Sequence, residues 1–221
     1  MAATNSELIT FGDWTLRVRS SQSEHPRLLV LIHGWTGDEN SMWVFTRALS
    51  KDYWMIAPRA LYPGEPSGFS WRPHQPDTFS WPSFEMLKPA AEALIRLIDE
   101  YSASVKLDAL QFDLMGFSQG AAMVNVMGML YPHRVGKMGV LAGFVPSGLE
   151  ELITQKPLAG KTIFVAHGSQ DQTVPVDRAR DSIKLLEQAG AQVTYCEDEV
   201  GHKLGINCLR ALENYLSTPI G

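Results

Sequence analysis

A serine between two glycines, in the segment Gly116-Phe117-Ser118-Gln119-Gly120, has the pattern of an activated nucleophile. An apolar run precedes this segment and a run of helical character follows it, so the serine is expected at a tight turn from a strand into a helix. The glycines would let the strand and the helix approach closely, and the turn would hold the serine in strained backbone geometry. The amino end of the helix would direct partial positive charge to the place where an anionic intermediate forms. The pattern therefore predicts nucleophilic acyl transfer.

A serine hydroxyl is a weak nucleophile at neutral pH and needs a base, for which histidine is best matched. In sheets of this kind the order along the chain is serine, acid, histidine. Only His167 and His202 follow Ser118 at a strand end, and only His202 leaves room for an acid on a different strand end. We therefore predict His202 as the base. His33 and His167 are predicted to pin loop backbones by hydrogen bonds.

Several carboxylates compete for the role of the acid that orients the histidine. Asp177 opens a helix, where capping or the helix dipole explains it, and Asp181 is expected to face solvent on that helix. Asp198 lies close to His202 along the chain but stays an alternative. Asp171 ends the loop after a buried strand and is the predicted acid.

The anionic intermediate needs two backbone N–H donors. Gln119, directly after the serine, is predicted to supply one of them. The loop after the first long strand supplies the other, for which we predict Trp35.

Strands and helices alternate along the chain, which predicts a mostly parallel sheet covered on both faces. The carboxyl ends of parallel strands share one edge, so the predicted site residues should meet there. A hairpin is expected over residues 8–18, strands at 28–32, 54–57, 112–115, 139–142, 162–165 and 192–196, and helices at 42–49, 85–101, 121–124, 177–189 and 205–216.

Residues 62–82 form one irregular stretch, rich in proline and aromatic side chains. An irregular stretch of this length inside a compact domain indicates either a functional loop over the active site or a packed surface loop with buried aromatics. Both interpretations stay open from the sequence alone.

The 221 residues fit one large domain over residues 1–221. The net charge of −5 and the lack of a basic stripe argue against a nucleic-acid partner. The two cysteines form no disulfide framework, and Cys208 falls in the apolar register of the last helix, so a core thiol is predicted there. Since neither a secretory signal nor an apolar run of about 20 residues is found, we expect a cytoplasmic protein without membrane insertion.

Taken together, these motifs resemble the phospholipase/carboxylesterase group of α/β-hydrolases, which includes acyl-protein thioesterases and small bacterial carboxylesterases. The Phe-Ser-Gln turn and the acid loop with its following Val-Pro are the most specific features. The matching segments are Leu31-Ile32-His33-Gly34, Gly37-Asp38-Glu39-Asn40, Ala57-Pro58-Arg59, Gly116-Phe117-Ser118-Gln119-Gly120, His167-Gly168-Ser169-Gln170-Asp171 with Val174-Pro175, and Gly201-His202.

The resemblance implies an α/β-hydrolase fold without a separate cap domain, and a serine carboxylesterase that uses no cofactor and no metal. It implies a small-molecule ester as substrate, with short to medium acyl or aryl groups. The residues implied are Ser118, Asp171 and His202 as the triad, Trp35 and Gln119 as the oxyanion donors, and Phe69, Trp71 and Val174 in the substrate cleft.

Other functions remain as alternatives. Within the resemblance these are a lysophospholipase or an acyl-protein thioesterase. A serine peptidase and a non-catalytic binding module on a hydrolase scaffold have less support, and a homodimer is left open.

The chain departs from the family pattern at Thr36, where relatives often carry a glycine in the loop that is expected to bind the oxyanion.

Overall fold

The computed structural model describes residues 6–47, 49–74 and 81–218. Their main feature is an eight-stranded sheet with the order β1-β2-β4-β3-β7-β8-β9-β10. Neighbouring strands are parallel from β4 to β10, whereas the β1–β2 hairpin joins β4 in antiparallel orientation. The strands are β1 (Glu7–Phe11), β2 (Trp14–Arg19), β3 (Arg27–Ile32), β4 (Tyr53–Pro58), β7 (Phe112–Phe117), β8 (Val135–Leu141), β9 (Thr162–Gly168) and β10 (Gln192–Asp198).

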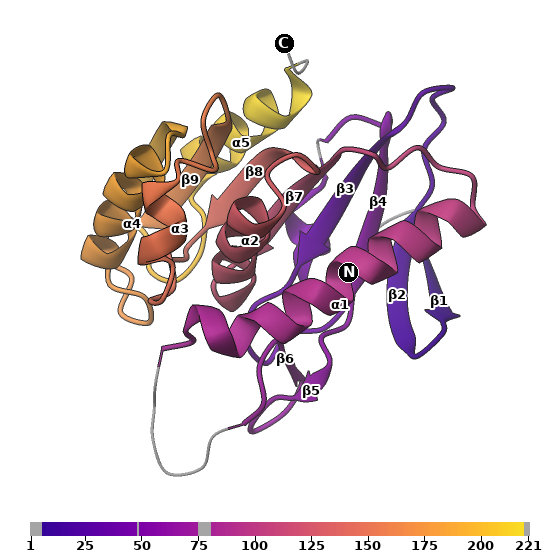
Figure 1. Cartoon of the computed structure of the whole chain (residues 1–221), viewed down its shortest axis with the longest axis horizontal. Coiled ribbons are helices and arrows are strands. Elements are labelled where there is room, and N and C mark those ends of the chain that lie inside the picture. Colours follow the sequence, from indigo (N-terminus) through magenta and orange to yellow (C-terminus); the bar gives the residue numbers. More distant parts are fainter. Residues whose placement is uncertain (1–5, 48, 75–80, 219–221) are drawn as a thin grey trace.

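Helices cover both faces of this sheet. The helices are α1 (Phe84–Ser104), α2 (Gln119–Leu130), α3 (Glu150–Thr154), α4 (Val176–Gln188) and α5 (Ile206–Ser217), with a 3₁₀ helix at Ser41–Phe45. Figure 1 views the face that α1 and α2 cover, which also packs against α4. The 3₁₀ helix and α5 pack on the opposite face. None of the described helices is both long and apolar enough to cross a bilayer.

The central strand β3 shows why two layers of helices are needed. Leu28, Val30 and Ile32 point into one core, and Leu29 and Leu31 point into the other. This follows from the two-residue period of a strand, and all five side chains are fully buried. An apolar run without alternation is therefore the correct signal for a strand buried on both sides.

The short helix α3 was not predicted, and α2 extends well beyond the expected residues 121–124. Two further elements also differ from the predictions. The helix expected at 42–49 is only the 3₁₀ turn Ser41–Phe45, a form that is common in short connections. Strand β8 begins at Val135 instead of residue 139. The first half of the strand was not predicted because the charged residue Lys137 interrupts its apolar pattern. The Lys137 side chain is buried, and its ammonium donates to carbonyl oxygens at the end of α5, including that of Leu216 at 3.4 Å.

The first described part of the irregular stretch, residues 62–74, is a packed loop; residues 81 and 82, just before α1, are described as well. Its short strands β5 (Tyr62–Pro63) and β6 (Phe69–Ser70) form a separate two-stranded sheet, which lies near the amino end of α1 in Figure 1. Phe69 also exchanges backbone hydrogen bonds of 2.9 and 3.0 Å with Gly37 and Thr36. The loop is thereby fastened to the segment after β3. Residues 75–80 lie outside the described part of the chain.

Candidate active site

Ser118 occupies the strained turn that the sequence predicts. Its φ and ψ are 54° and −115°, between the end of β7 and the start of α2. A Cβ atom on Gly116 would lie 2.2 Å from the carbonyl oxygen of Gly120, and one on Gly120 would lie 2.0 Å from that of Ile32. Only glycine fits at both positions, so the two glycines let β7, α2 and β3 approach closely enough to form this turn.

The structure brings Asp171 and His202 together. Nδ1 of His202 lies 2.6 Å from Oδ2 of Asp171. The other carboxylate oxygen accepts the backbone N–H groups of Thr173 and Val174 at 2.8 and 2.9 Å. Because a carboxylate only accepts, Nδ1 of His202 carries the hydrogen and Nε2 is left free to take a proton. In such a pair the carboxylate holds the imidazole ring in one orientation, and the imidazole can act as a base.

Close contact between two loops keeps this pair in place. The N–H of Gln170, in the acid loop, donates to the carbonyl oxygen of Val200 at 3.0 Å, just before His202. A Cβ on Gly168 would lie 2.2 Å from the carbonyl oxygen of Gly201. The glycine at the end of β9 therefore allows the acid loop and the histidine loop to touch.

His202 also borders the nucleophile turn. Its ring centroid lies 4.8 Å from that of Phe117, the residue before Ser118. Within the described part of the chain, no hydrogen bond joins the Ser118 hydroxyl to the His202 ring. Catalytic hydrogen bonds are often long before substrate binds, so proton transfer between these two side chains stays a prediction.

The other candidate aspartates have different partners. Asp177 is 83% exposed and pairs with Arg180, and Asp181 is 70% exposed and pairs with Lys184. Asp198 accepts the N–H of Cys208 at 3.0 Å. Asp171, with a side chain that has no exposed surface, is thus the one of the four that contacts His202.

The oxyanion loop runs beside Ser118, since a Cβ on Gly34 would lie 3.3 Å from Cβ of Ser118. His33 pins this loop as predicted, with Nδ1 2.7 Å from the Gly34 carbonyl oxygen and Nε2 accepting the N–H of Ala60 at 3.0 Å. Burial lowers the pKa of the His33 imidazole, which favours its neutral form. This arrangement holds the neighbouring Trp35 backbone close to the nucleophile.

A buried ion pair supports the same loop. Glu39 is almost fully buried and accepts two hydrogen bonds from Arg59, at 2.8 and 3.0 Å. Burial by itself would raise the pKa of Glu39, but the hydrogen bonds from Arg59 outweigh it, so the pKa of this carboxyl is lowered. Both residues belong to segments that the family resemblance singled out.

The sequence analysis missed the role of the Gln119 side chain. Its Oε1 accepts the N–H of Trp71 at 2.9 Å, and its Nε2 donates to the hydroxyl of Ser70 at 3.2 Å. The indole N–H of Trp71 in turn donates to the carbonyl oxygen of His33 at 2.8 Å. Gln119 and Trp71 therefore join the nucleophile turn, the packed loop and the oxyanion loop. No local sequence pattern signals contacts over such separations.

The predicted substrate-cleft residues differ in exposure. Trp71 and Val174 are 0% and 1% exposed, so in this structure they position backbone groups and offer no surface to a substrate. Phe69 is partly exposed and packs against Arg59, with the guanidinium 4.6 Å from the ring centroid. Trp35 is 49% exposed. Exposed or partly exposed aromatic side chains next to the nucleophile turn therefore include Trp35 and Phe117, and the partly exposed Phe69 is hydrogen-bonded to the loop after Trp35.

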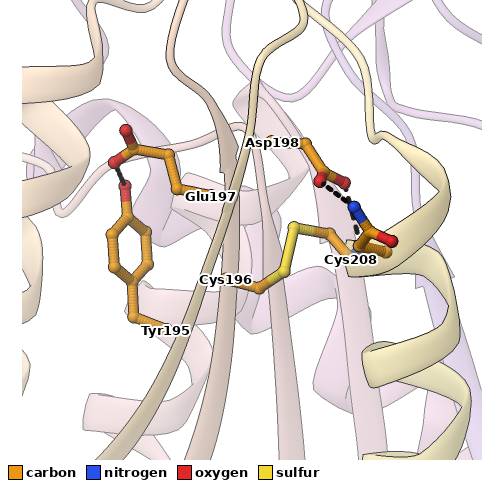
Figure 2. The surroundings of a disulfide bond; sticks show 6 residues. Tyr195, Cys196, Glu197, Asp198 and Cys208 are labelled. Carbon is orange, nitrogen blue, oxygen red and sulfur yellow. Dashed lines mark hydrogen bonds between the residues drawn. A yellow bond between two sulfur atoms is a disulfide. The ribbon is translucent and has the colours of Figure 1, made fainter.

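Cys208 is not the free core thiol that the sequence predicts. It is buried in α5, as its register indicated, but it forms a disulfide with Cys196 of β10 (Figure 2). The two Cα atoms lie 5.5 Å apart. The pairing depends on how α5 packs on β10, which the spacing of two cysteines does not reveal.

This disulfide closes the chain segment that carries His202. Inside the same segment, Asp198 accepts the Cys208 N–H and the side-chain amide of Asn207 at 2.9 Å (Figure 2). Cys196, Asp198 and Cys208 are close enough to hold a metal ion, but the disulfide uses both sulfur atoms. The disulfide and Asp198 therefore determine where α5 begins relative to β10.

A family model described as Phospholipase/Carboxylesterase matches residues 15–220. Acyl-protein thioesterase 1 of Kluyveromyces lactis is 24% identical over 187 residues, which cover 78% of this chain and 82% of the yeast protein. A probable carboxylesterase SOBER1-like of Arabidopsis thaliana is 32% identical over 107 residues, 47% of this chain and 40% of the plant protein. The match thus spans about two fifths of that plant relative.

Solved structures agree with the fold. A carboxylesterase from Mesorhizobium loti superimposes with a TM-score of 0.81 at 24% identity, covering 98% of this chain and 100% of that chain. The Bacillus cereus carboxylesterase gives a TM-score of 0.80 at 20% identity, covering 93% and 94%. These likenesses confirm the predicted α/β-hydrolase fold with its mostly parallel sheet. Because the family model covers nearly the entire sequence, the chain belongs to the phospholipase/carboxylesterase family.

Proposed function

We propose that this chain is a serine carboxylic-ester hydrolase that acts through an acyl-enzyme on short to medium acyl or aryl esters. The observation that carries the proposal is the hydrogen bond between Asp171 and His202, at the sheet edge where the strained turn presents Ser118. Family membership supports the hydrolase class. The triad itself is our assignment.

In this mechanism Nε2 of His202 takes the proton of Ser118 as the serine oxygen bonds to the ester carbonyl carbon. The carbonyl electron pair moves to oxygen, and the resulting oxyanion accepts hydrogen bonds from the N–H groups of Trp35 and Gln119. The bond to the alcohol then breaks, and the leaving oxygen takes the proton from His202. Water, giving a proton to His202, attacks the acyl-enzyme, after which the acid leaves and Ser118 regains its proton.

A fluorophosphonate probe tests the nucleophile directly. We expect it to label the protein at Ser118, and we expect Ser118→Ala to lose both labelling and ester turnover, the latter by up to ~10⁶-fold if the triad acts as a unit. Ser217→Ala, at an exposed position at the end of α5, is the matched control and should keep both. Turnover by Ser118→Ala within tenfold of the parent would exclude this nucleophile. Absence of labelling would favour the binding-module alternative.

The choice of ester needs a second experiment. The relative named as an acyl-protein thioesterase covers most of this chain, so thioester hydrolysis is the second candidate function, with lysophospholipid hydrolysis beside it. Rates over p-nitrophenyl esters of increasing acyl length, with an acyl thioester and a lysophospholipid in parallel, distinguish a short site from a long channel. A peptide substrate in the same series tests the serine-peptidase alternative.

We also propose that residues 1–221 act as one domain, with Phe69 contacting the substrate. A cytoplasmic location remains a prediction, which fractionation of cells that express the protein would test.

A further inference from the structure

A cavity of about 330 Å³ lies between the segment after β8 and the helices α3 and α4. Gly143, directly before the cavity wall, packs on the first turn of α2 after Ser118, because a Cβ on Gly143 would lie 2.3 Å from Cβ of Ala121. The next two residues, Phe144 and Val145, line the cavity. Asn125 donates to the Phe144 carbonyl oxygen at 3.0 Å, and the Val145 N–H donates to the hydroxyl of Ser182 at 2.7 Å. These two hydrogen bonds fix the backbone of Phe144 and Val145 in the cavity wall.

The one cationic side chain among the residues that line this cavity is Arg178. It lies in the first turn of α4, four residues after Val174, whose N–H donates to Asp171. Its guanidinium carbon lies 4.3 Å from the ring centroid of Trp81 and 4.9 Å from that of Phe144. The two aromatic rings hold the cation next to the acid loop.

Arg178 has no anionic partner among the described residues. Its Nε–H is buried and donates no hydrogen bond to the described protein atoms. Arg180, two residues further along the same helix, instead pairs with both Asp177 and Glu197. Arg178 is partly exposed, so ligands can reach its guanidinium from solvent, and arginine stays charged in proteins. Its charge is available to a ligand.

The acidic residues near the cavity do not neutralise it. Glu150 and Asp181 also line the cavity, but both are exposed. Glu150 accepts the N–H of Gly148 at 3.2 Å, and Asp181 pairs with Lys184 at 2.8 Å. They would repel an anion at the rim, so a carboxylate has to reach past them to Arg178.

We propose that Arg178 binds a carboxylate on the acyl part of the substrate, so that the enzyme prefers half-esters of dicarboxylic acids to neutral esters of similar size. The planar guanidinium matches a carboxylate in geometry and in charge. This inference rests on the proposed esterase function, which it narrows to a substrate class.

The test compares the mono-4-nitrophenyl esters of succinic, glutaric and adipic acid, which carry a free carboxylate, with neutral esters in which that carboxylate is methylated and the 4-nitrophenyl group is kept. The parent protein should show a higher kcat/KM for at least one half-ester than for its neutral partner. Arg178→Gln should lower that ratio about tenfold or more, which is the size of effect expected for losing a hydrogen bond to a charged group. Arg178→Lys should restore part of it, and the control Arg180→Gln should leave it unchanged.

A binding measurement separates this inference from the esterase proposal. Free glutarate should raise the thermal unfolding midpoint of the parent and of Arg180→Gln, but not that of Arg178→Gln. If neither the half-esters nor the neutral esters are hydrolysed while glutarate still binds through Arg178, the esterase proposal fails and the anion site stands. A parent that shows no preference for half-esters and no glutarate binding overturns the inference, as does an equal effect of Arg178→Gln on both ester classes. Arg178 would then only join Trp81 to Phe144 by packing.

Discussion

The disulfide between Cys196 and Cys208 should contribute measurably to stability. The two residues are 12 positions apart, and closing a loop of about that length removes enough entropy from the unfolded chain to add roughly 3 kcal/mol to the free energy of unfolding at 25 °C. For a chain of this size, 1 kcal/mol shifts the thermal midpoint by about 2–4 °C. Reduction should therefore lower the midpoint by about 6–12 °C.

Thermal unfolding followed by circular dichroism, with and without dithiothreitol, measures this difference. The double variant Cys196→Ala/Cys208→Ala should unfold close to the reduced parent and should not respond to the reductant, which controls for effects of the reductant elsewhere. Ester turnover, measured well below the midpoint, should also fall on reduction, because His202 lies on the segment that the disulfide closes. The fall should be smaller than for loss of a triad residue, since backbone hydrogen bonds still join the two loops.

Thiol counting supplies the result that would refute this reasoning. The folded parent, without reductant, should react with no equivalent of a maleimide, and the reduced, unfolded parent should react with two. Two reactive thiols in the untreated protein would show that the bond is absent. An unchanged thermal midpoint on complete reduction would show that the loop is held by other contacts alone.

Three further outcomes are expected. Thr36→Gly should raise the free energy of unfolding by about 1 kcal/mol in urea titrations, because Thr36 has a φ of 64° and a side chain in that region is strained; a destabilised variant would contradict this. Burial lowers the pKa values of His33 and His167, so below about pH 6.5, where an unfolded histidine binds a proton, the unfolded state holds more protons and stability should fall as pH falls. Unfolding midpoints in urea that stay level from pH 7 to pH 5 would argue against this. Asp171→Asn should lower kcat by about 10⁴-fold, the effect of disturbing the histidine tautomer in such triads, because an amide group would face Nδ1 of His202; steady-state kinetics within tenfold of the parent would remove Asp171 from the triad.

Local signals in the sequence were sufficient for the nucleophile turn. Close approach of three backbone segments excludes any side chain at Gly116 and Gly120. The turn therefore needs a glycine on each side of Ser118, and this pattern can be recognised within five consecutive residues. The acid loop and the histidine loop could be placed in the same way, because parallel strands deliver their carboxyl ends to one edge. This topology brings Asp171 near His202, and the structure decides between Asp171 and the alternative Asp198.

Contacts between distant segments could not be predicted. Gln119 bonds to residues 48 and 49 positions away, and Lys137 reaches carbonyl oxygens 78 and more positions away. Such partners depend on side-chain packing, and no periodic or spacing pattern encodes them. The family resemblance placed Trp71 in the substrate cleft, whereas its buried indole donates to the carbonyl oxygen of His33.

Apolar periodicity and glycine positions by themselves indicated most of the strand–helix order and the chemistry to be expected at Ser118, because these depend on backbone geometry and on burial over a few neighbouring residues. The family was indicated by the resemblance of sequence motifs around Ser118, Asp171 and His202. The tertiary structure alone decided that Cys196 and Cys208 form a bond, and that Arg178 packs against Trp81 and Phe144 without an anionic partner among the described residues. Both depend on the position of one packed element relative to another, which is set by the sum of many weak contacts across the core.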